Sequence, residues 1–567
     1  MPTVRGAKAL KLPPGLRMMR DYERPWLKSD LAAGAALSAF LIPAGMAYAE
    51  AAGLPAVTGL YASIIPLLAY AVFGPSRVLI IGPDSSLAPM IAAAVLPLAG
   101  KDPDEAVALA GLLALLIGGL LLAGRVFRLG FVTGLLSKPI RVGYLNGIAI
   151  VIMVSQLPKL LGVSGTGGSL VNISTGTAQA VAQGAINPVA FLFGAGTIAI
   201  IVVCRFLPWK FPGVLIAVVA ATTLTAVLDL TAALPTVGAL PQGLPAPALG
   251  GISLEDVIAL LGPAAGIALI AFADTSVLSK SFAARSGVQV DGNQEMGALG
   301  VANVASGLFG GFPISGSTSR TPIAVEAGAK SPLSGAVAAA LVVLFMILAP
   351  GLTTFLPSSV LAGVVMVAAA SIFDLKTLLR LLRMSRTEAA LLVATTLGVA
   401  FVGVLEGIVV AIGLSLIAFV LRALDPYRTE LGSVGDVPGY HDLSRHPEGQ
   451  RVPGLVIARF DAPLFFANGA VFTEHIRTLV ASAPEPVRWV IVASEAITGL
   501  DTTALDDLVA LDDELAKRGI SLVFAEMKGP SKDRLILFGA SSRFGPDHFF
   551  PTVNNAVRSY KRTFELE

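Results

Sequence analysis

A short polar run, Gly310–Thr321, interrupts the long apolar stretches of this sequence. It reads GGFPISGSTSRT and combines glycines, a proline, several hydroxyl side chains and one arginine, Arg320. In a bilayer, non-helical backbone is tolerated only where protein or a water-filled cavity surrounds it. A break followed by a new helix offers free N–H groups and the positive end of a helix dipole to an anion. The run therefore predicts an anion site at membrane depth.

Arg320 is predicted in the first turn after this break, where the helix dipole disfavours a cation unless a negative group lies nearby. An arginine at this depth costs about 2.5–3.5 kcal/mol on insertion scales, so it must be paired or face a cavity. Two interpretations follow. Arg320 is a ligand for an anion, or it forms a structural ion pair with an acid such as Asp274. The helix start favours the ligand.

A second polar break, IGPDSS at 81–86, begins another apolar segment and contains Asp84 and Ser85. Interrupted segments in corresponding positions of two halves are the best sequence pointer to a transporter binding site. We therefore expect the two half-helix starts to face each other near the bilayer midplane. The alternative is two loops that end ordinary short helices.

Hydroxyl side chains in both breaks can donate to an oxyanion. They are Ser315, Ser317, Thr318, Ser319, Ser85 and Ser86. Each can equally cap a helix, because Ser and Thr are favoured at that position on local grounds alone. Together they predict a polar cavity.

Two carboxylates are candidates for coupling an ion to the anion. Asp84 either caps its helix or neutralises Arg320 until an anion displaces it. Displacement leaves the carboxylate near a second negative charge in a partly desolvated cavity, and both effects favour proton uptake. Asp274, in GIALIAFADTSVL, is either a coupling-ion site or an acid paired with a lysine near the membrane edge.

Composition defines the class of protein that holds these residues. Of 567 residues, 54% are apolar and only 14% charged, whereas soluble domains carry about 25% charged residues. Several apolar segments of about 20 residues indicate a polytopic α-helical membrane protein. The net charge of +2 points to no nucleic-acid partner. No Walker A or GxGxxG pattern appears, so we expect no enzyme, no cofactor and no metal site.

Fourteen apolar segments are predicted, seven in each half. They lie at about 31–50, 57–73, 83–99, 105–123, 139–161, 189–205, 212–230, 254–279, 294–309, 317–329, 333–349, 358–373, 387–403 and 404–422. An odd number in each half makes the two halves inverted repeats.

The placement of Lys and Arg predicts the orientation of these segments. Residues 162–188 and 350–357 carry no charge, whereas the connections at 125–141 and 376–386 each hold four basic residues. Basic residues accumulate in cytoplasmic loops. Both termini are therefore predicted in the cytoplasm, with the chain in the cell (inner) membrane. All four histidines (His441, His446, His475 and His548) follow the apolar region, so a proton relay inside the membrane must use carboxylates.

The composition changes after Arg422. Strands are predicted at 454–467, 487–494 and 520–526, and helices at 470–481, 502–518 and 531–539. This alternation is typical of a small α/β domain, which we expect in the cytoplasm.

Several motifs carry a resemblance to a known family. They are PAGMAYAEAAGLPAVTGLYAS at 43–63, GPSRVLIIGPDSS at 74–86, DGNQEMGALGVANVASGLFGGFP at 291–313 and SGSTSRT at 315–321. With FDAPLFFANGAVF at 460–472 and ITGLDTTALDDL at 497–508, the chain resembles the sulfate permease (SulP) anion transporters, which carry a C-terminal STAS domain. The resemblance covers nearly the whole chain.

The resemblance implies a domain organisation. A cytoplasmic segment (1–30) precedes a transport domain (31–425), and the STAS domain follows at 430–567. Within the transport domain, a core (31–123 and 254–349) moves against a gate (139–230 and 358–422). The protein is expected to form a homodimer in the lipid bilayer.

The resemblance also assigns roles to site residues. Ser319 and Arg320 match a Ser-Arg pair at the start of the tenth segment, and Tyr48 falls where members place an aromatic residue in the first. Asp274 lies on the helix where the family places an acid facing the substrate. Ala44 replaces a glutamine that often follows the proline. Asp84 takes a position that can be aromatic in the family.

Three functions remain open at this stage. The first is a secondary transporter of sulfate, bicarbonate or dicarboxylate, coupled to H⁺ or Na⁺ or working by exchange. The second is an anion channel or a motor-like membrane protein on the same scaffold. The third is a regulatory receptor that signals through the STAS domain, where Thr503 matches a hydroxyl phosphorylated in bacterial anti-sigma antagonists. Locally Thr503 is better explained as a helix N-cap, with Asp501 and Thr502 as rivals.

Overall fold

The computed structural model describes residues 12–100, 102–130, 137–163, 169–206, 213–241, 243, 252–285, 290–317, 320–435 and 437–566. The chain forms two compact units, Met1–Ser415 and Leu416–Glu567. The first unit is helical, and the second is built around a β-sheet.

The first half of the helical unit contains a short leading helix and then the predicted apolar segments. Its helices are α1 (Pro14–Arg20), α2 (Trp26–Ala51), α3 (Ala56–Phe73), α4 (Ala88–Ala99), α5 (Pro103–Val126), α6 (Lys138–Leu161), α7 (Leu170–Ala182), α8 (Pro188–Phe206) and α9 (Gly213–Val227). A two-residue strand, β1 (Ile81–Gly82), precedes α4, and one 3₁₀ turn, η2 (Leu230–Ala232), follows α9.

The second half repeats this order of long helices around a break. Its helices are α10 (Leu254–Arg285), α11 (Gly292–Leu308), α12 (Arg320–Glu326), α13 (Leu333–Leu348), α14 (Ser358–Ile372), α15 (Leu375–Met384), α16 (Arg386–Leu397) and α17 (Val404–Leu424). The strand β2 (Ser315–Gly316) precedes α12, the 3₁₀ turn η3 (Pro350–Phe355) precedes α14, and a π-helical turn, η4 (Gly398–Val402), follows α16.

The predicted segments agree with these helices, with instructive differences. Within the described residues, seven helices are long and apolar enough to cross a membrane, and α4, α9 and α13 are shorter apolar helices. The tenth segment, predicted at 317–329, contains only the 7 residues of α12. Residues 327–328, after α12, form a turn. Two further helices, α7 and α15, lie in stretches that were predicted as connections.

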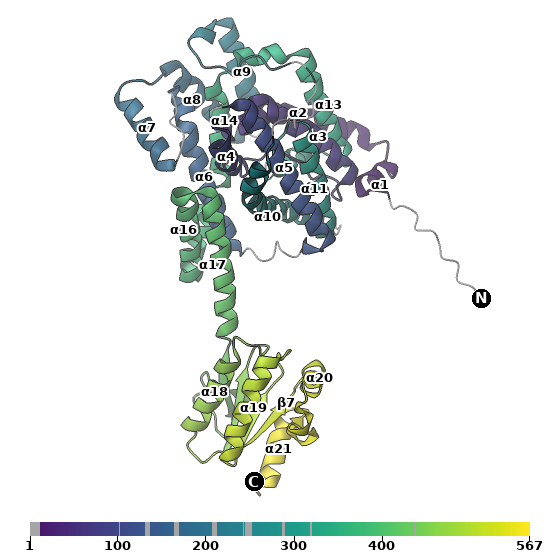
Figure 1. Cartoon of the computed structure of the whole chain (residues 1–567), viewed down its shortest axis with the longest axis vertical. Helices are drawn as coiled ribbons and strands as arrows, with labels where there is room; N and C mark the ends of the chain where they lie inside the picture. The colour runs from purple at the N-terminus through teal and green to yellow at the C-terminus, as the bar shows by residue number, and fades with distance from the viewer. Residues whose placement is uncertain are drawn as a thin grey trace, which may run out of the picture. The chain divides into compact units, whose positions relative to one another are not determined.

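The helices of the first unit pack in two groups. In one, α5 packs on α11, α2 on α13, and α3 on both α2 and α11. In the other, α6 packs on α14 and α16, and α8 packs on α9 and α14. Figure 1 shows α3, α5, α11 and α13 on one side of this unit and α7, α8 and α16 on the other. The names core and gate for two such groups remain a prediction.

Helices α5 and α11 approach through glycines. A Cβ atom added at Gly118 would lie 2.8 Å from the carbonyl oxygen of Gly300, and one added at Gly300 would lie 3.0 Å from that of Gly118. A second such pair, Gly111 and Gly307, lies further along the same two helices, where a Cβ at Gly111 would lie 3.1 Å from the Gly307 oxygen. Only glycine lets two helix backbones come this close. We call this contact the glycine seam.

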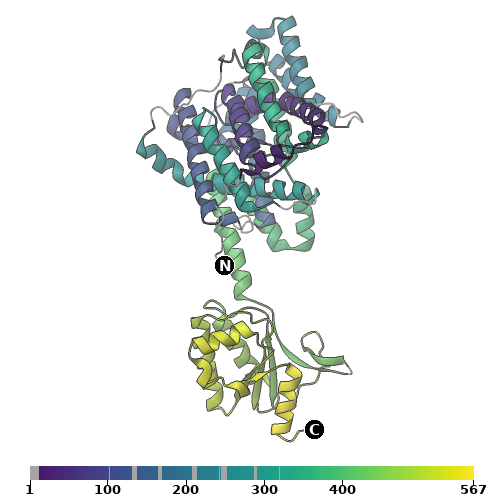
Figure 2. The same ribbon diagram turned by 90° about the vertical axis from the view of Figure 1, so that its right-hand side faces the viewer.

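The second unit contains a six-stranded sheet in the order β4-β3-β5-β6-β7-β8. Its strands are β3 (Arg428–Val434), β4 (Val437–Asp442), β5 (Leu455–Phe460), β6 (Trp489–Ala493), β7 (Ser521–Ala525) and β8 (Phe549–Phe550). Strands β5 to β8 are parallel, whereas β3 and β4 form an antiparallel hairpin. Figure 2 shows this hairpin, in green, reaching beyond the rest of the sheet.

Helices cover both faces of this sheet. They are α18 (Gly469–Ser482), α19 (Thr502–Lys517), α20 (Gly529–Leu537) and α21 (Val553–Thr563), with 3₁₀ turns η5 (Ala540–Ser542) and η6 (Pro546–His548). Phe472 of α18 and Leu508 of α19 are buried in one core, and Val557 and Tyr560 of α21 in another. The predicted α/β alternation is confirmed for β5, α18, β6, α19, β7 and α20. The N-cap of α19 is Asp501, which accepts from the Ala504 N–H at 2.8 Å, so the preference for Thr503 was wrong.

Candidate anion site

The two breaks in the helical unit meet. Strand β1 pairs with β2 in antiparallel register, with Ile81 opposite Gly316 and Gly82 opposite Ser315. The half-helices α4 and α12 begin a few residues after these strands. This pairing satisfies backbone groups that would otherwise be unpaired at membrane depth. It confirms the expectation that the two breaks lie face to face.

Side chains from neighbouring helices hold the second break. The Asn303 amide of α11 donates to the Ile314 carbonyl oxygen at 3.1 Å, and its own oxygen accepts from the Ile314 N–H at 2.9 Å. The Ser306 hydroxyl donates to the Phe312 oxygen at 2.7 Å. On α10, the Thr275 hydroxyl oxygen accepts from the Gly316 N–H at 2.8 Å. The second break is therefore fixed by a frame of three polar side chains.

The first break is held mainly by its own residues. The Asp84 carboxylate accepts from the Ser86 hydroxyl at 2.5 Å and from the Ser86 N–H at 3.1 Å. The Asp84 carbonyl oxygen accepts from the N–H groups of Leu87 and Ala88, where α4 begins. Asp84 thus closes the turn that leads into α4, whose own N-cap position, Leu87, has no side-chain cap.

Arg320 lies between the two breaks with only 1% of its surface exposed. Its Nη2 donates to the Gly82 carbonyl oxygen at 3.0 Å and lies 3.6 Å from Oδ1 of Asp84. The buried Nε has no hydrogen-bond partner among the described residues. A Cβ atom at Gly82 would lie 2.6 Å from Nη1, so the guanidinium fits here because residue 82 is glycine. Asp84 therefore pairs with Arg320 while its carboxylate also accepts from Ser86 in the turn before α4, and the two contacts do not exclude each other.

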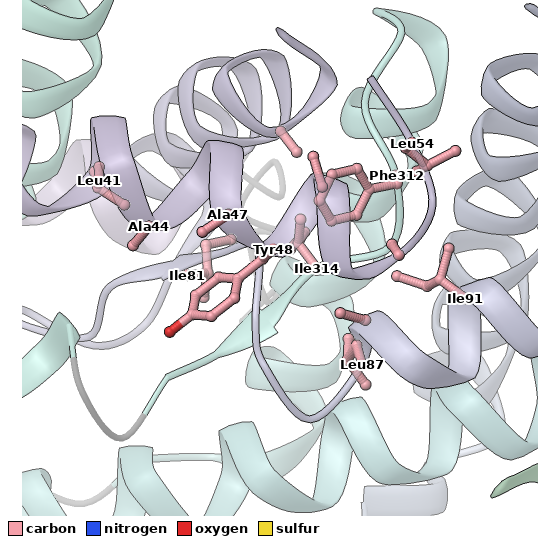
Figure 3. Close-up of a cluster of buried hydrophobic side chains, with 14 of the residues drawn as sticks. Leu41, Ala44, Ala47, Tyr48, Leu54, Ile81, Leu87, Ile91, Phe312 and Ile314 are labelled. Carbon is pink, nitrogen blue, oxygen red and sulfur yellow. The ribbon is translucent and has the colours of Figure 1, made fainter. Parts of the chain in front are cut away.

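Tyr48 comes to the same place from α2. It is buried, with 1% of its surface exposed, and interacts electrostatically with Arg320. Figure 3 shows its hydroxyl directed away from the other labelled side chains of the hydrophobic cluster that contains Leu87 and Ile314. The Tyr48 ring packs in the apolar core, and its hydroxyl points out of this hydrophobic cluster.

A third element, α6, contributes residues that the sequence did not single out for the site. Tyr144 is buried, and its hydroxyl makes no hydrogen bond with a described residue. It interacts electrostatically with Asp84 and Asp274 and lies near Ser86, though in a geometry too loose for a hydrogen bond. Arg141, one turn earlier, interacts with Asp274. A lone tyrosine in an apolar segment carries no sequence signal for such a role.

The structure brings most of the predicted site residues together. Arg320 pairs with Asp84, Tyr48 is close enough to act electrostatically on Arg320 and Asp274 on Asp84, and Ser85 is buried in the same break. Ser315 is buried, and its hydroxyl has no partner among the described residues. Thr318 and Ser319 lie outside the described residues, so their predicted roles stay predictions.

Glu295, in the first turn of α11, connects several helices. It is fully buried and accepts hydrogen bonds from the Tyr70 hydroxyl at 2.5 Å and the Ser279 hydroxyl at 2.6 Å. These partners come from α3 and α10, so Glu295 ties three helices together. Its contacts are structural and lie apart from those of Arg320.

This arrangement can bind an anion. A buried guanidinium keeps one N–H group unused, two half-helix starts approach it, and hydroxyl groups line the breaks. Two carboxylates, Asp84 and Asp274, lie near enough to balance charge. Fold and site together define a polytopic membrane protein with paired discontinuous helices.

Comparisons with known proteins agree with this class. The sulfate permease family model matches residues 27–395, and the STAS domain model matches residues 446–556. A protein of Mycobacterium tuberculosis named as a probable sulfate transporter is 40% identical over 551 residues, covering 97% of this chain and 98% of its own length. The chloroplastic sulfate transporter 4.1 of Arabidopsis thaliana is 29% identical over 582 residues, covering 98% of this chain and 84% of that protein.

Solved structures show the same fold. The murine anion transporter Slc26a9, in its inward-facing state, superposes with a TM-score of 0.91 at 21% identity, covering 99% of this chain and 96% of that one. The transmembrane domain of the cyanobacterial bicarbonate transporter BicA gives a TM-score of 0.59 at 27% identity, covering 70% of this chain and 98% of that domain. The fold is therefore the predicted inverted repeat of seven plus seven segments with a STAS domain.

The chain belongs to the sulfate permease family of anion transporters and carries a C-terminal STAS domain. It is a multi-pass membrane protein, and its family consists of transporters rather than enzymes.

Proposed function

We propose that this chain is a secondary transporter that binds one small oxyanion at Arg320 and carries it by alternating access. The observation that carries the proposal is the buried Arg320 guanidinium, placed between two half-helix starts with its Nε unused by any described residue. A charged N–H group in this setting is stabilised by an anion that accepts from it. The name of the relative from M. tuberculosis makes sulfate the first substrate to test, ahead of bicarbonate and dicarboxylate.

Charge balance supports coupling to a cation. An arriving anion meets Arg320 already beside Asp84, with Asp274 interacting with Asp84. Two unit charges 4 Å apart interact by about 4 kcal/mol at an effective dielectric constant of 20, so the carboxylates oppose anion entry. Uptake of a proton by one carboxylate, or of Na⁺ between them, removes this repulsion. We propose a proton on Asp84 as the first coupling ion to test.

The two helix packing groups support a moving core. In the proposal, residues 31–123 and 254–349 form the core that holds both breaks, while residues 139–230 and 358–422 form the gate. Tyr144 and Arg141 of α6 are then the gate residues that face the site in this state. Homodimer formation and the inner membrane, with both termini in the cytoplasm, complete the proposal.

Uptake into proteoliposomes tests the transport function. Purified full-length protein is assayed with labelled sulfate, bicarbonate and a dicarboxylate, each with and without an inward proton or Na⁺ gradient. We expect saturable uptake of one anion, accumulation under a proton gradient, and counterflow when the vesicles are preloaded with the same anion. Unsaturable flux without counterflow would instead indicate a channel, and binding without any flux would indicate a receptor.

Cysteine labelling tests the orientation separately. In a Cys204→Ser background, a cysteine at position 170 should react with an impermeant reagent from the outside only, and one at position 433 from the inside only. The opposite pattern at either position would overturn the proposed topology.

A further inference from the structure

Helix α15 differs from the apolar helices on either side of it. It reads LKTLLRLLRM and connects α14 to α16. From the sequence alone, its basic residues predicted only that this connection lies on the cytoplasmic side of the membrane. The structure adds that they belong to an ordered helix with distinct faces.

The start of α15 is anchored to the rest of the helical unit. The Asp374 side chain caps it, accepting from the Thr377 N–H at 2.9 Å and from the Thr377 hydroxyl at 2.6 Å. The Asp374 N–H donates in turn to the Asn146 oxygen of α6 at 2.7 Å. This contact fixes where α15 begins and the direction in which it leaves α14.

One side of α15 packs inward. Leu381 is buried in a small cluster with Val142, Ala389 and Leu392. With its inner side and its start both fixed, the outward face of α15 cannot turn freely. The residues on that face are therefore presented in a defined direction.

The outward face has a basic strip and an apolar strip. Lys376, Arg380 and Arg383 are exposed and follow the spacing i, i+4, i+7, which places them on one side of a helix. Leu375, Leu379 and Leu382 have the same spacing one residue earlier, with 49%, 50% and 52% of their surfaces exposed. A helix with neighbouring basic and apolar strips is suited to lie in a membrane interface.

The basic strip is uncompensated. Within the described residues, none of its three members forms an ion pair, and α15 itself contains no acid. Water alone would solvate the cations but would leave the leucines unfavourably exposed. An anionic membrane surface satisfies both, because phosphate groups lie directly above acyl chains. Soluble anions would satisfy the basic strip alone.

We propose that α15 is an interfacial helix that binds anionic phospholipid headgroups through Lys376, Arg380 and Arg383, with Leu375, Leu379 and Leu382 in the acyl boundary. The inference is independent of the transported anion and of the coupling ion. It predicts that anionic lipid is held at a defined place on the transport unit.

A tryptophan at position 379 reports which lipids touch this helix. Full-length Leu379→Trp protein is reconstituted in vesicles containing brominated phosphatidylglycerol or brominated phosphatidylcholine, and the quenching of the unmodified protein, with its own tryptophans, is subtracted. We expect quenching by both lipids, with an apparent affinity for phosphatidylglycerol at least about fivefold higher, the factor that about 1 kcal/mol for a single cation provides. High salt should reduce the preference.

Charge variants test the basic strip. In the Leu379→Trp background, Lys376→Gln/Arg380→Gln/Arg383→Gln should bring the ratio of the two affinities close to one. Arg380→Lys/Arg383→Lys should keep the preference, because the charge remains. The matched control, Lys517→Gln/Arg518→Gln/Arg562→Gln, removes three exposed cations from the second unit and should leave the ratio unchanged.

Three results would overturn the proposal. Equal quenching by the two lipids in Leu379→Trp would show that the helix has no anionic preference. Absence of quenching would show that another part of the protein, or a second copy, covers α15. An equal loss of preference in the control triple variant would show that overall charge, not this strip, selects the lipid.

Discussion

The two breaks perform the same backbone task by different means. The first, which precedes α4, carries the carboxylate Asp84. Apart from its pairing with the second break and the Arg320 bond to Gly82, it is held by contacts within its own loop. The second, which precedes α12, carries Arg320 and is held from outside by Asn303, Ser306 and Thr275. The two paired breaks thus carry opposite charges and are held in place by different sets of contacts.

This difference suggests a division of roles. A guanidinium on a break framed by two other helices stays in place when its counter-ion leaves. The Asp84 carboxylate is held by Ser86 and by its pairing with Arg320. Once an anion replaces it beside Arg320, it can rotate away at the cost of its bonds to Ser86, each worth about 1.5–3 kcal/mol because one partner is charged. We therefore expect Arg320 to act as the fixed ligand and Asp84 as the exchangeable one. Each prediction below tests one side of this contrast.

The largest expected effect comes from Arg320→Ala. Removing the fixed charge should weaken anion binding by about a hundredfold or more, the equivalent of about 3 kcal/mol for a lost charged hydrogen-bond donor. Arg320→Lys should restore only part of the affinity, because an ammonium cannot reproduce the guanidinium fork. Calorimetric titration of the purified variants, with Arg562→Ala as a control of equal charge change, measures this. Unchanged affinity in the alanine variant would end the ligand assignment.

Asn303→Ala should destabilise the second break. It leaves both the N–H and the carbonyl oxygen of Ile314 without their side-chain partner, and each buried orphan costs about 1–3 kcal/mol. Thermal unfolding in detergent should show a clear drop in midpoint. Asn293→Ala is the matched control, since that amide accepts a single bond from the Gly130 N–H. A smaller drop in the unfolding midpoint for Asn303→Ala than for Asn293→Ala would contradict the inference that side chains of neighbouring helices hold the second break.

Asp84→Asn should alter coupling more than affinity. Asparagine can still accept from the Ser86 N–H but cannot carry a proton, so anion binding should persist with weaker pH dependence. Proton-driven accumulation in proteoliposomes should be lost while counterflow remains. Asp274→Asn provides the comparison. If Asp84→Asn keeps the full pH dependence and still concentrates its anion, Asp84 is only a cap and Asp274 becomes the leading candidate.

Ser86→Ala should have the smallest effect. It removes the hydroxyl bond to Asp84 but keeps the Ser86 N–H bond, so the free energy of unfolding should fall by about 1.5 kcal/mol, the lower end of the range for a hydrogen bond to a charged group. The freed carboxylate should exchange more easily, which predicts slightly tighter anion binding at low pH. A loss of stability equal to that of Asn303→Ala would show that the two breaks are supported alike.

The sequence predicted the features that rest on strong local signals. Glycines, hydroxyls and a proline in apolar surroundings located both breaks, and basic residues with apolar runs located the fourteen segments. Arg320 and Asp84 were assigned because charge is costly at that depth.

Other features depend on packing that no local pattern encodes. Tyr144 approaches the site because α6 packs beside the breaks, and an aromatic residue in an apolar segment has no signature for that. The tenth segment was predicted too long because hydropathy does not show where a helix ends: α12 ends at Glu326, and a turn follows. Strands β3 and β4 and helix α21 were missed since their alternation is interrupted by glycine, proline and charged residues.

The glycine seam between α5 and α11 has a mechanical consequence. Helices joined through side chains can slide a little as rotamers exchange, whereas at Gly118 and Gly300 each backbone stands directly against the other. Sliding there would force carbonyl oxygens into overlap. Helix α5 follows the half-helix of the first break, and α11 leads into the second. The two helices therefore move as one rigid pair. A displacement of one break then displaces the other break as well, without deforming the contact between α5 and α11.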